Sequence, residues 1–138
     1  MPITYSFDHD RRLILTKVTG ELDLALTEEY FALLQQDDKC PDKAIEIVDF
    51  SAVSDFSIHY GEMSRITDIY QGTKSGKDIQ ATIFNCTSKL SYGIARMLQA
   101  LHEFANDKHI VIITRSNGEL EKCIEDLRSN KAEESDTL

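Results

Sequence analysis

The chain has 138 residues, the length of one ordinary globular domain. Hydrophobic residues make up 41% of it and charged residues 28%, fractions that exclude a disordered, collagen-like or disulfide-stapled chain. The formal net charge of −9 excludes the basic surface on which nucleic-acid binding depends. We therefore expect a single folded domain with no nucleic-acid partner.

Cysteine content and apolar runs bear on cellular location. The three cysteines are odd in number and widely spaced, which favours reduced thiols over a disulfide framework. The sequence begins without a basic segment followed by an apolar stretch, so it predicts no secretory signal. The longest purely apolar run, residues 110–113, is far shorter than the ~20 residues of a membrane span. These features predict a cytoplasmic protein without a membrane span.

In the first half of the chain, the sequence predicts two strands, then one helix, then a third strand. Apolar and polar residues alternate over residues 3–7 and branched residues fill 13–18, which together predict an antiparallel hairpin. Apolar residues at helical spacing over 27–34, with acidic residues at the start, predict a helix. A short apolar strand over 44–48 follows.

The second half continues with strands and helices in turn. Apolar spacing predicts helices over 63–70, 90–105 and 120–127, and strands over 80–84 and 109–114. The last of these strands is nearly all apolar, which predicts a central position in a parallel sheet with both faces covered. From Asn130 onward the residues are polar, and we expect a frayed tail.

This order of elements predicts the fold class. Strands separated by helices require right-handed crossovers and give a mainly parallel sheet, to which the hairpin adds an antiparallel edge. We therefore predict an α/β fold in which residues 1–129 form one domain and residues 130–138 a polar tail. The domain is expected to hold a mixed sheet of about five strands and about four helices.

No catalytic or metal-binding motif is intact in the sequence. No pair of cysteines or histidines has the spacing of metal ligands, so we expect neither a metal nor a cofactor. Cys86 lies between a strand and a helix, where the helix start can lower a thiol pKa, but Tyr92 stands where a phosphate-clamping arginine would be. We interpret Cys86 as a buried structural thiol. An enzyme that uses Cys86 or His59 is the weaker alternative.

Polar residues gather where the predicted parallel strands end. Ligands and partners of open α/β sheets bind beyond the carboxyl ends of the strands. Asp49 and Ser51 follow the strand that ends at residue 48, and Ser88 and Ser116 follow the next two strands. These four residues are candidates for binding a partner or an anion. For Ser88 and Ser116 the alternative is helix capping, in which a hydroxyl group satisfies free backbone amides.

The order of elements and one short motif resemble a known family. The segment Val48-Asp49-Phe50-Ser51, within residues 46–57, is similar to the apolar-Asp-apolar-Ser signature of the SpoIIAA-like branch of the STAS domains, the fold of anti-sigma factor antagonists. The resemblance covers about residues 3–128. The helical segment 92–97 also resembles the variant of this superfamily that is grouped with SEC14-type, lipid-binding folds.

The resemblance implies a non-catalytic regulatory module that binds a protein partner, such as an anti-sigma-type kinase. The SEC14-like feature implies the alternative of a module that binds a small molecule or lipid. Members of the family place a phosphorylatable serine directly before a glycine, and Ser57 is its nearest counterpart here. Because Ile58, His59 and Tyr60 separate Ser57 from Gly61, an ordinary loop or capping serine is the alternative interpretation.

The predicted hairpin also bears on the oligomeric state. An exposed edge strand offers unpaired backbone groups to other chains and has to be protected. Pairing with a second copy is one common solution, so we expect a homodimer.

Overall fold

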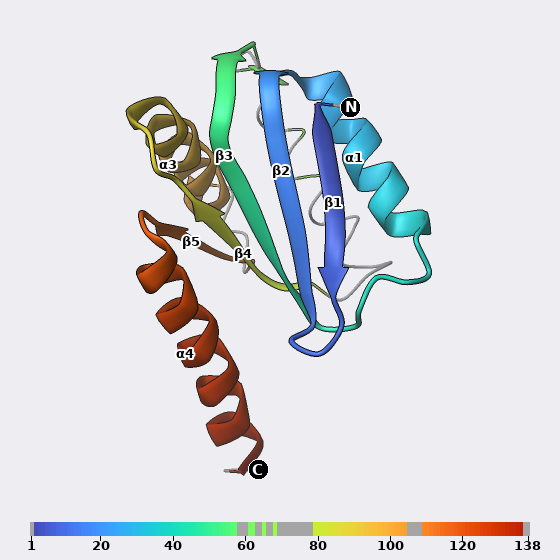
Figure 1. The fold of residues 1–138 in the computed structure, drawn as a ribbon, viewed down its shortest axis with the longest axis vertical. Coiled ribbons are helices and arrows are strands. Elements are labelled where there is room, and N and C mark those ends of the chain that lie inside the picture. Colours follow the sequence, from blue (N-terminus) through green and yellow to red (C-terminus); the bar gives the residue numbers. More distant parts are fainter. Residues whose placement is uncertain are drawn as a thin grey trace.

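A computed structural model of the chain describes residues 2–57, 61, 62, 65, 68, 79–104 and 109–136. The strands and helices, in chain order, are β1 (Ile3–Asp8), β2 (Leu13–Leu22), α1 (Leu24–Gln36), β3 (Ala44–Phe56), β4 (Ile79–Asn85), α3 (Lys89–Phe104), β5 (Ile110–Thr114) and α4 (Asn117–Asp136). The strands form one five-stranded sheet in the order β1-β2-β3-β4-β5 (Figure 1). β1 and β2 pair antiparallel, and the other pairs are parallel. The predicted α/β fold with an antiparallel N-terminal hairpin is therefore confirmed.

Three helices, rather than about four, are found in the described residues. The apolar residues that predict the other helix, Met63, Ile66, Ile69 and Tyr70, lie outside this part of the chain. α3 confirms the clearest helical pattern of the sequence.

The position of β5 corrects one prediction. β5 is an edge strand, not the central strand that its apolar sequence predicts, and Ile110 stays 45% exposed. Both α3 and α4 contact β5, so the apolar run reflects two covered faces. At the edge, Gln99 Nε2 on α3 donates a hydrogen bond to the carbonyl oxygen of Val111 at 3.1 Å. An all-apolar strand therefore indicates covered faces and does not by itself indicate a central place in the sheet.

The start of α1 differs from the predicted start at Thr27. Asp23 is the N-cap, and its Oδ1 accepts a hydrogen bond from the backbone N–H of Leu26 at 2.8 Å. Because a carboxylate at this position satisfies one of the free amides of the first turn, the helix begins at Leu24.

β3 is much longer than the predicted strand over residues 44–48. It continues through a segment rich in serine and aspartate as far as Phe56. That second half pairs in parallel with the end of β2, from Thr19 opposite Ala52 to Leu22 opposite Phe56. Pairing with a distant strand, rather than local apolar pattern, therefore keeps this polar segment extended.

α1 and α3 cover one face of the sheet, which we call the α1/α3 face. Its core is the larger of two apolar clusters and includes two stacked rings, Phe50 and Phe84, with centroids 5.1 Å apart. The helices add Tyr30, Phe31, Leu34, Ile94, Ala95 and Leu98 to this core. Aromatic side chains from a strand and from a helix thus make this face the thicker layer of the molecule.

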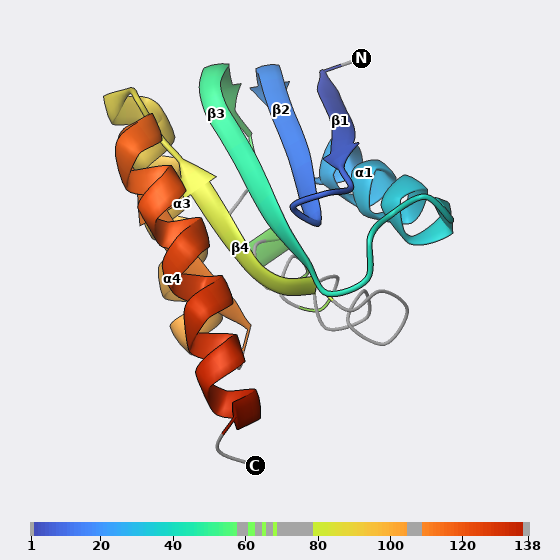
Figure 2. The same cartoon turned by 60° about the horizontal axis from the view of Figure 1, so that its bottom comes forward.

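α4 packs on the opposite face, which we call the α4 face (Figure 2). Its core is small and consists of Leu13, Ile45, Ile47, Ile83 and Ile124. Leu15, on the same side of β2, is 40% exposed. Among the described elements, α4 therefore covers the β3–β5 side of this face and leaves the β1–β2 side open.

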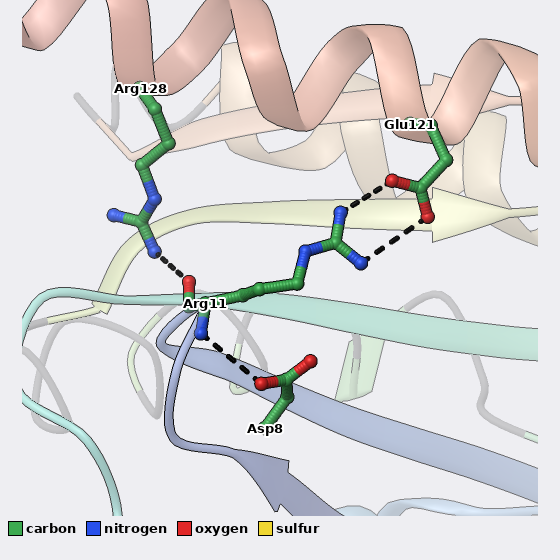
Figure 3. Close-up of polar contacts among 4 residues, drawn as sticks. All are labelled: Asp8, Arg11, Glu121 and Arg128. Atoms are coloured by element: carbon green, nitrogen blue, oxygen red, sulfur yellow. Dashed lines mark hydrogen bonds and ion pairs between the residues drawn. The ribbon is translucent and has the colours of Figure 1, made fainter.

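Two arginines fasten α4 to the turn between β1 and β2 (Figure 3). Arg128 of α4 donates hydrogen bonds to the carbonyl oxygens of Arg11 and Arg12, each at 2.9 Å, and of Lys43 at 3.1 Å. Arg11 in turn forms a two-pronged ion pair with Glu121. Arg12 and Lys43 both have φ near 53°, in the left-handed region, so the turns that present two of these carbonyls are conformationally demanding. Burial, and then the charge of Arg12, lower the pKa of Arg128.

α4 continues to Asp136, beyond residue 129, where the sequence predicted the end of the ordered domain. The segment after Asn130 contains Lys, Ala and Glu, which have high helix propensity. Polar character alone therefore did not end the helix.

Candidate functional site

An open groove of about 440 Å³ lies on the α4 face, at the level where β4 ends and α4 begins. Polar side chains line it, together with a few apolar ones from β2, β3 and α4: Thr4, Ser6, Lys17, Asp49, Asn85, Asn117, Leu15, Ile47 and Leu120. The groove exists because α4 leaves the β1–β2 side of this face open. We take it as the candidate functional site.

Asp49 lies in the middle of β3, opposite Asn85 at the end of β4. Sequence analysis placed it at the end of its own strand, but β3 runs on past it. Asp49 Oδ1 accepts hydrogen bonds from the backbone N–H of Ser51 at 2.8 Å and from its hydroxyl at 2.6 Å. These bonds fix the carboxylate beside the groove. Asp49 and Ser51, two predicted site residues, are thus brought together.

A second series of hydrogen bonds fixes the side chains that line the groove beside α4. The hydroxyl of Thr114 donates to Asn85 Oδ1 at 2.9 Å, and Asn85 Nδ2 donates to Asn117 Oδ1 at 3.3 Å. The backbone N–H of Cys86 donates to the carbonyl of Thr114 at 2.8 Å. Ends of β4 and β5 are therefore locked to the first residue of α4.

Lys17 is the positive charge of the groove. It is the partner of Asp49 in the register of β2 and β3, and of Thr4 in the register of β1 and β2. A cation, a carboxylate and two amide side chains thus share one groove, so it offers both donors and acceptors of hydrogen bonds.

Ser88 and Ser116 act as helix caps in the structure. Ser88 Oγ accepts from the backbone N–H of Ser91 at 3.1 Å, and Ser91 Oγ accepts in return from the N–H of Ser88 at 3.1 Å. Ser116 Oγ accepts from the N–H of Glu119 at 3.1 Å. The bonds between Ser88 and Ser91 are reciprocal, and the two caps satisfy amides of the first turns of α3 and α4. Neither serine lines the groove, although Ser116 directly precedes Asn117.

Ser57 follows the last residue of β3 and is half-buried. Its backbone N–H donates to the carbonyl of Leu22 at 3.0 Å, which holds it beside the end of β2. The structure does not bring it to the groove. Ser57 is thus a separate position from the group around Asp49.

The polar groove residues Thr4, Ser6, Lys17, Asn85 and Asn117 escaped the sequence analysis. Lys17 lies in an alternating strand, where an exposed polar residue is ordinary. Asn85 and Asn117 lie at or just after the ends of β4 and β5, where the sequence already predicted a site, so their positions could have indicated them. Only the position of α4 shows which side of β2 stays open and so brings Lys17 into the site.

Cys86 is buried, 2% exposed, as expected for a structural thiol. Burial raises the pKa of the Cys86 thiol from 9.0 to about 11, and the nearby carboxylate of Asp49 adds to the rise. Only a small fraction of this group is thiolate near neutral pH, and the thiolate is the reactive form. The geometry therefore does not support Cys86 as a nucleophile. His59, the other residue of that alternative, lies outside the described residues.

A buried carboxylate lies on the α1/α3 face. Glu46 on β3 is fully buried, and its two oxygens accept hydrogen bonds from the hydroxyls of Tyr30 and Thr82. Since the one proton of each hydroxyl is used in this way, Thr16 donates to Tyr30 and His109 Nε2 donates to Thr82, both at 2.7 Å. Tyr30 and Thr82 thus donate to Glu46 directly, and Thr16 and His109 support these two hydroxyls. This arrangement explains how a central strand tolerates a carboxyl group.

A small apolar cavity of about 40 Å³ lies in the same core, lined by residues of all strands but β5 and of both helices of this face, including Val18, Phe31, Phe84 and Leu98. It can hold a water molecule, but an engineered cavity that binds benzene measures roughly 150 Å³. A lipid would therefore require α1 or α3 to move away from the sheet.

Two other kinds of site are not found in the described residues. Within the described ranges, no three histidine, cysteine or acidic side chains gather as metal ligands would. None of the described helices has the length and hydropathy of a bilayer-spanning segment.

The structure resembles two solved structures. One is an uncharacterized protein from the DUF3478 family with a SpoIIAA-like fold, from Shewanella loihica PV-4, with a TM-score of 0.56, 14% identity, and coverage of 88% of this chain and 93% of that chain. The other is the anti-sigma factor antagonist SpoIIAA in its unphosphorylated form, with a TM-score of 0.50, 13% identity, and coverage of 89% and 97%. No protein-family model matches the sequence, and no curated protein is similar enough to count as a match. The chain therefore has a SpoIIAA-like α/β fold, as its motif and element order predicted.

Proposed function

We propose that this chain is a non-catalytic regulatory module that binds another protein through the groove around Asp49. The observation that carries this proposal is the groove itself, in which Lys17, Asp49, Asn85 and Asn117 are held in place by the sheet and by α4. One solved structure of similar fold is described as an anti-sigma factor antagonist. An anti-sigma-type kinase in the cytoplasm is accordingly the partner we propose first.

The groove has the chemistry of an interaction surface. Leu15, Ile47 and Leu120 supply apolar contact beside the charged and amide groups. Apolar area at the centre with hydrogen-bonding groups around it is the usual composition of a protein interface. Ser51 and Ser116 lie at the margin of this surface and would contact a larger partner there.

Ser57 is the proposed phosphorylation site of the module. A phosphate would add nearly two negative charges next to the exposed carboxylate of Asp55, in a chain whose net charge is already −9. We expect phosphorylation to weaken binding, because a partner surface shaped for a neutral hydroxyl at Ser57 would reject the added charge. Mass spectrometry of the purified chain after incubation with its kinase partner and ATP would locate the modified residue.

The proposal is tested by capture of partners with the intact chain and two charge-reversal variants. Lys17→Glu reverses the charge inside the groove, whereas Lys39→Glu reverses an exposed lysine outside it. We expect a stoichiometric protein partner, identified by mass spectrometry, to be retained by the wild type and by Lys39→Glu and lost from Lys17→Glu. Equal capture by both variants would show that the groove is not the binding surface.

The alternative is a module that binds a small apolar molecule or lipid. It is supported by the apolar cavity between the sheet, α1 and α3, and opposed by the volume of only about 40 Å³. Native mass spectrometry separates the two functions, since a retained ligand adds mass to the purified chain. A bound lipid in the absence of any protein partner would replace our proposal with this alternative.

A further inference from the structure

β1 forms one edge of the sheet, and its outer side carries free backbone groups. The carbonyl of Pro2 accepts a hydrogen bond from the N–H of Thr19 at 2.7 Å. Because hydrogen-bonded pairs alternate along an antiparallel ladder, the even-numbered residues of β1 bond to β2, and the N–H and C=O groups of Ile3, Tyr5 and Phe7 point away from it. Within the part of the chain that the structure describes, no other backbone group bonds to these outward groups.

β1 lacks the features that keep edge strands from pairing with other chains. Residues 3–7 contain no charge, proline or glycine, and the pairing with β2 runs through all six residues of β1 without a bulge. Edge strands are ordinarily protected by such features. On the other edge, the side chain of Gln99 donates a hydrogen bond to the carbonyl oxygen of Val111 on β5. Among the described residues the two edges thus differ, and β1 is the open one.

A small hollow of about 20 Å³ lies between β1 and α1, next to where an added strand would lie. Pro2, Ile3, Leu26 and Leu33 supply its apolar lining. α1 lies beside β1 (Figure 1), on the α1/α3 face, and Leu33 on its surface is 43% exposed. The side chains of a further strand next to β1 would cover these apolar groups.

We propose that β1 pairs with β1 of a second copy of this chain, antiparallel, about a two-fold axis through Tyr5. In this register Tyr5 faces Tyr5, and Ile3 faces Phe7 of the second copy, so every outward N–H meets a carbonyl. The outward groups repeat symmetrically about Tyr5, which makes the strand complementary to itself. Since residues 3–7 are uncharged, this pairing places no like charges opposite each other despite the net charge of −9. For these two reasons a second copy fits this edge.

The register makes a prediction about side chains on the α4 face. Thr4 of one copy lies opposite Ser6 of the other, and both side chains are exposed in the single chain. Like charges placed directly opposite across a sheet destabilise the pair, and opposite charges stabilise it. Two variants that share Thr4→Glu and differ only at residue 6 therefore test both the surface and the register.

The experiment measures the dissociation constant of the full-length chain by sedimentation equilibrium. We expect the wild type to form dimers, Thr4→Glu/Ser6→Glu to dissociate at least about tenfold more readily, and Thr4→Glu/Ser6→Lys to dimerise at least as well as the wild type. Far-ultraviolet circular dichroism and the melting temperature confirm that both variants are folded. In the dimer, the amides of Ile3, Tyr5 and Phe7 should be protected from hydrogen exchange, increasingly so at higher concentration.

Three results would overturn the proposal. A wild-type chain that stays monomeric at every concentration shows that this edge does not pair with itself, whether or not it accepts a strand of another protein. A dimer that withstands Thr4→Glu/Ser6→Glu unchanged has its interface elsewhere. A dimer lost equally in both variants does not have the register centred on Tyr5.

Discussion

The two faces of the sheet are built differently. On the α1/α3 face, aromatic side chains from strands and helices fill the core and a hydrogen-bonded carboxylate lies fully buried beneath them. On the α4 face, five buried side chains and the contacts of two arginines hold one helix, and the rest of the face stays open. We infer that the first face supplies most of the stability and the second supplies the surface for recognition.

This division explains why the groove lies where it does. A site formed by an uncovered part of a sheet needs the other face to be well packed, because the open part contributes little burial. Polar residues such as Lys17 and Asp49 cost little on the open face, since water reaches them. The following predictions compare the faces, beginning with the largest expected difference.

Two adjacent residues of β4 compare the faces directly, because their side chains point to opposite sides. Phe84 lies in the α1/α3 core and Ile83 in the α4 core. We expect Phe84→Ala to lower the free energy of unfolding by roughly 3–5 kcal/mol and Ile83→Ala by roughly 2–3 kcal/mol, because α4 can shift to fill the space. Denaturant titration followed by circular dichroism measures both. A larger loss for Ile83→Ala would reverse the assignment of the faces.

The cysteines of the two faces should differ in reactivity. Cys86 belongs to the α1/α3 core, whereas Cys123 packs half-buried against the α4 core. Burial raises the pKa of both thiols, that of Cys86 to about 11 from 9.0, so its thiolate fraction at pH 8 is roughly a hundredfold below that of an ordinary thiol. Mass spectrometry during alkylation should find Cys86 modified last. Labelling of Cys86 before Cys123 in the folded chain would contradict the burial argument.

The raised pKa of Cys86 also fixes the sign of a pH effect. The folded chain keeps this proton up to a higher pH than the unfolded chain, so the unfolded state binds fewer protons above pH 9. Stability should therefore fall as the pH rises from about 9 to about 11, and Cys86→Ser should reduce this fall. An unchanged slope in the variant would show that other groups cause it.

The buried carboxylate gives the third comparison. Tyr30→Phe removes the hydroxyl that donates to Glu46 and accepts from Thr16, and we expect a loss of roughly 1–3 kcal/mol, since buried polar groups lose a partner. Tyr5→Phe is the matched control. Its hydroxyl donates to Asp37 at 3.0 Å in a half-exposed position, where water can replace it. Equal losses in thermal or denaturant unfolding would mean that burial does not strengthen the contact with Glu46.

Periodic patterns in the sequence predicted much of the fold, and the predictions that were wrong have physical causes. The hairpin and α3 were predicted because their apolar residues repeat locally. β3 was cut short at residue 48 because its second half is polar, and its extended shape comes from pairing with β2. β5 was predicted to be central because its residues are nearly all apolar. An edge strand with helices on both faces has the same apolar sequence as a central strand.

The site was predictable in part for the same reason. Asp49 and Ser51 stood out as polar residues after an apolar run, and the structure brings them together. Lys17 did not stand out, because only the placement of α4 shows which side of β2 is open. Nothing in the sequence indicates how Glu46 is buried, because its hydroxyl partners Tyr30 and Thr82 lie far away in the sequence.

On the α4 face, Arg128 should matter more than its partial exposure suggests. It donates to three backbone carbonyls and also to Gln80 Oε1 at 2.6 Å. We expect Arg128→Met to lower the free energy of unfolding by about 1–2 kcal/mol, because the acceptors lose their common donor. Arg96→Met, which removes one exposed contact with Gln99, should cost less than about 0.5 kcal/mol. Similar losses for the two would show that water replaces Arg128.

The smallest effect is expected for the ion pair between Arg11 and Glu121. Both side chains are about half exposed, at 42% and 55%, so solvent and salt screen their attraction. A double-mutant cycle with Arg11→Met and Glu121→Gln should give a coupling energy of about 0.2–1 kcal/mol, and molar salt should nearly abolish it. The contacts of Arg128 with backbone carbonyls should keep most of their strength in the same salt. A coupling energy for the ion pair that exceeded the cost of Arg128→Met would mean that charge attraction, rather than capture of the strand-start carbonyls by Arg128, holds α4 on its open face.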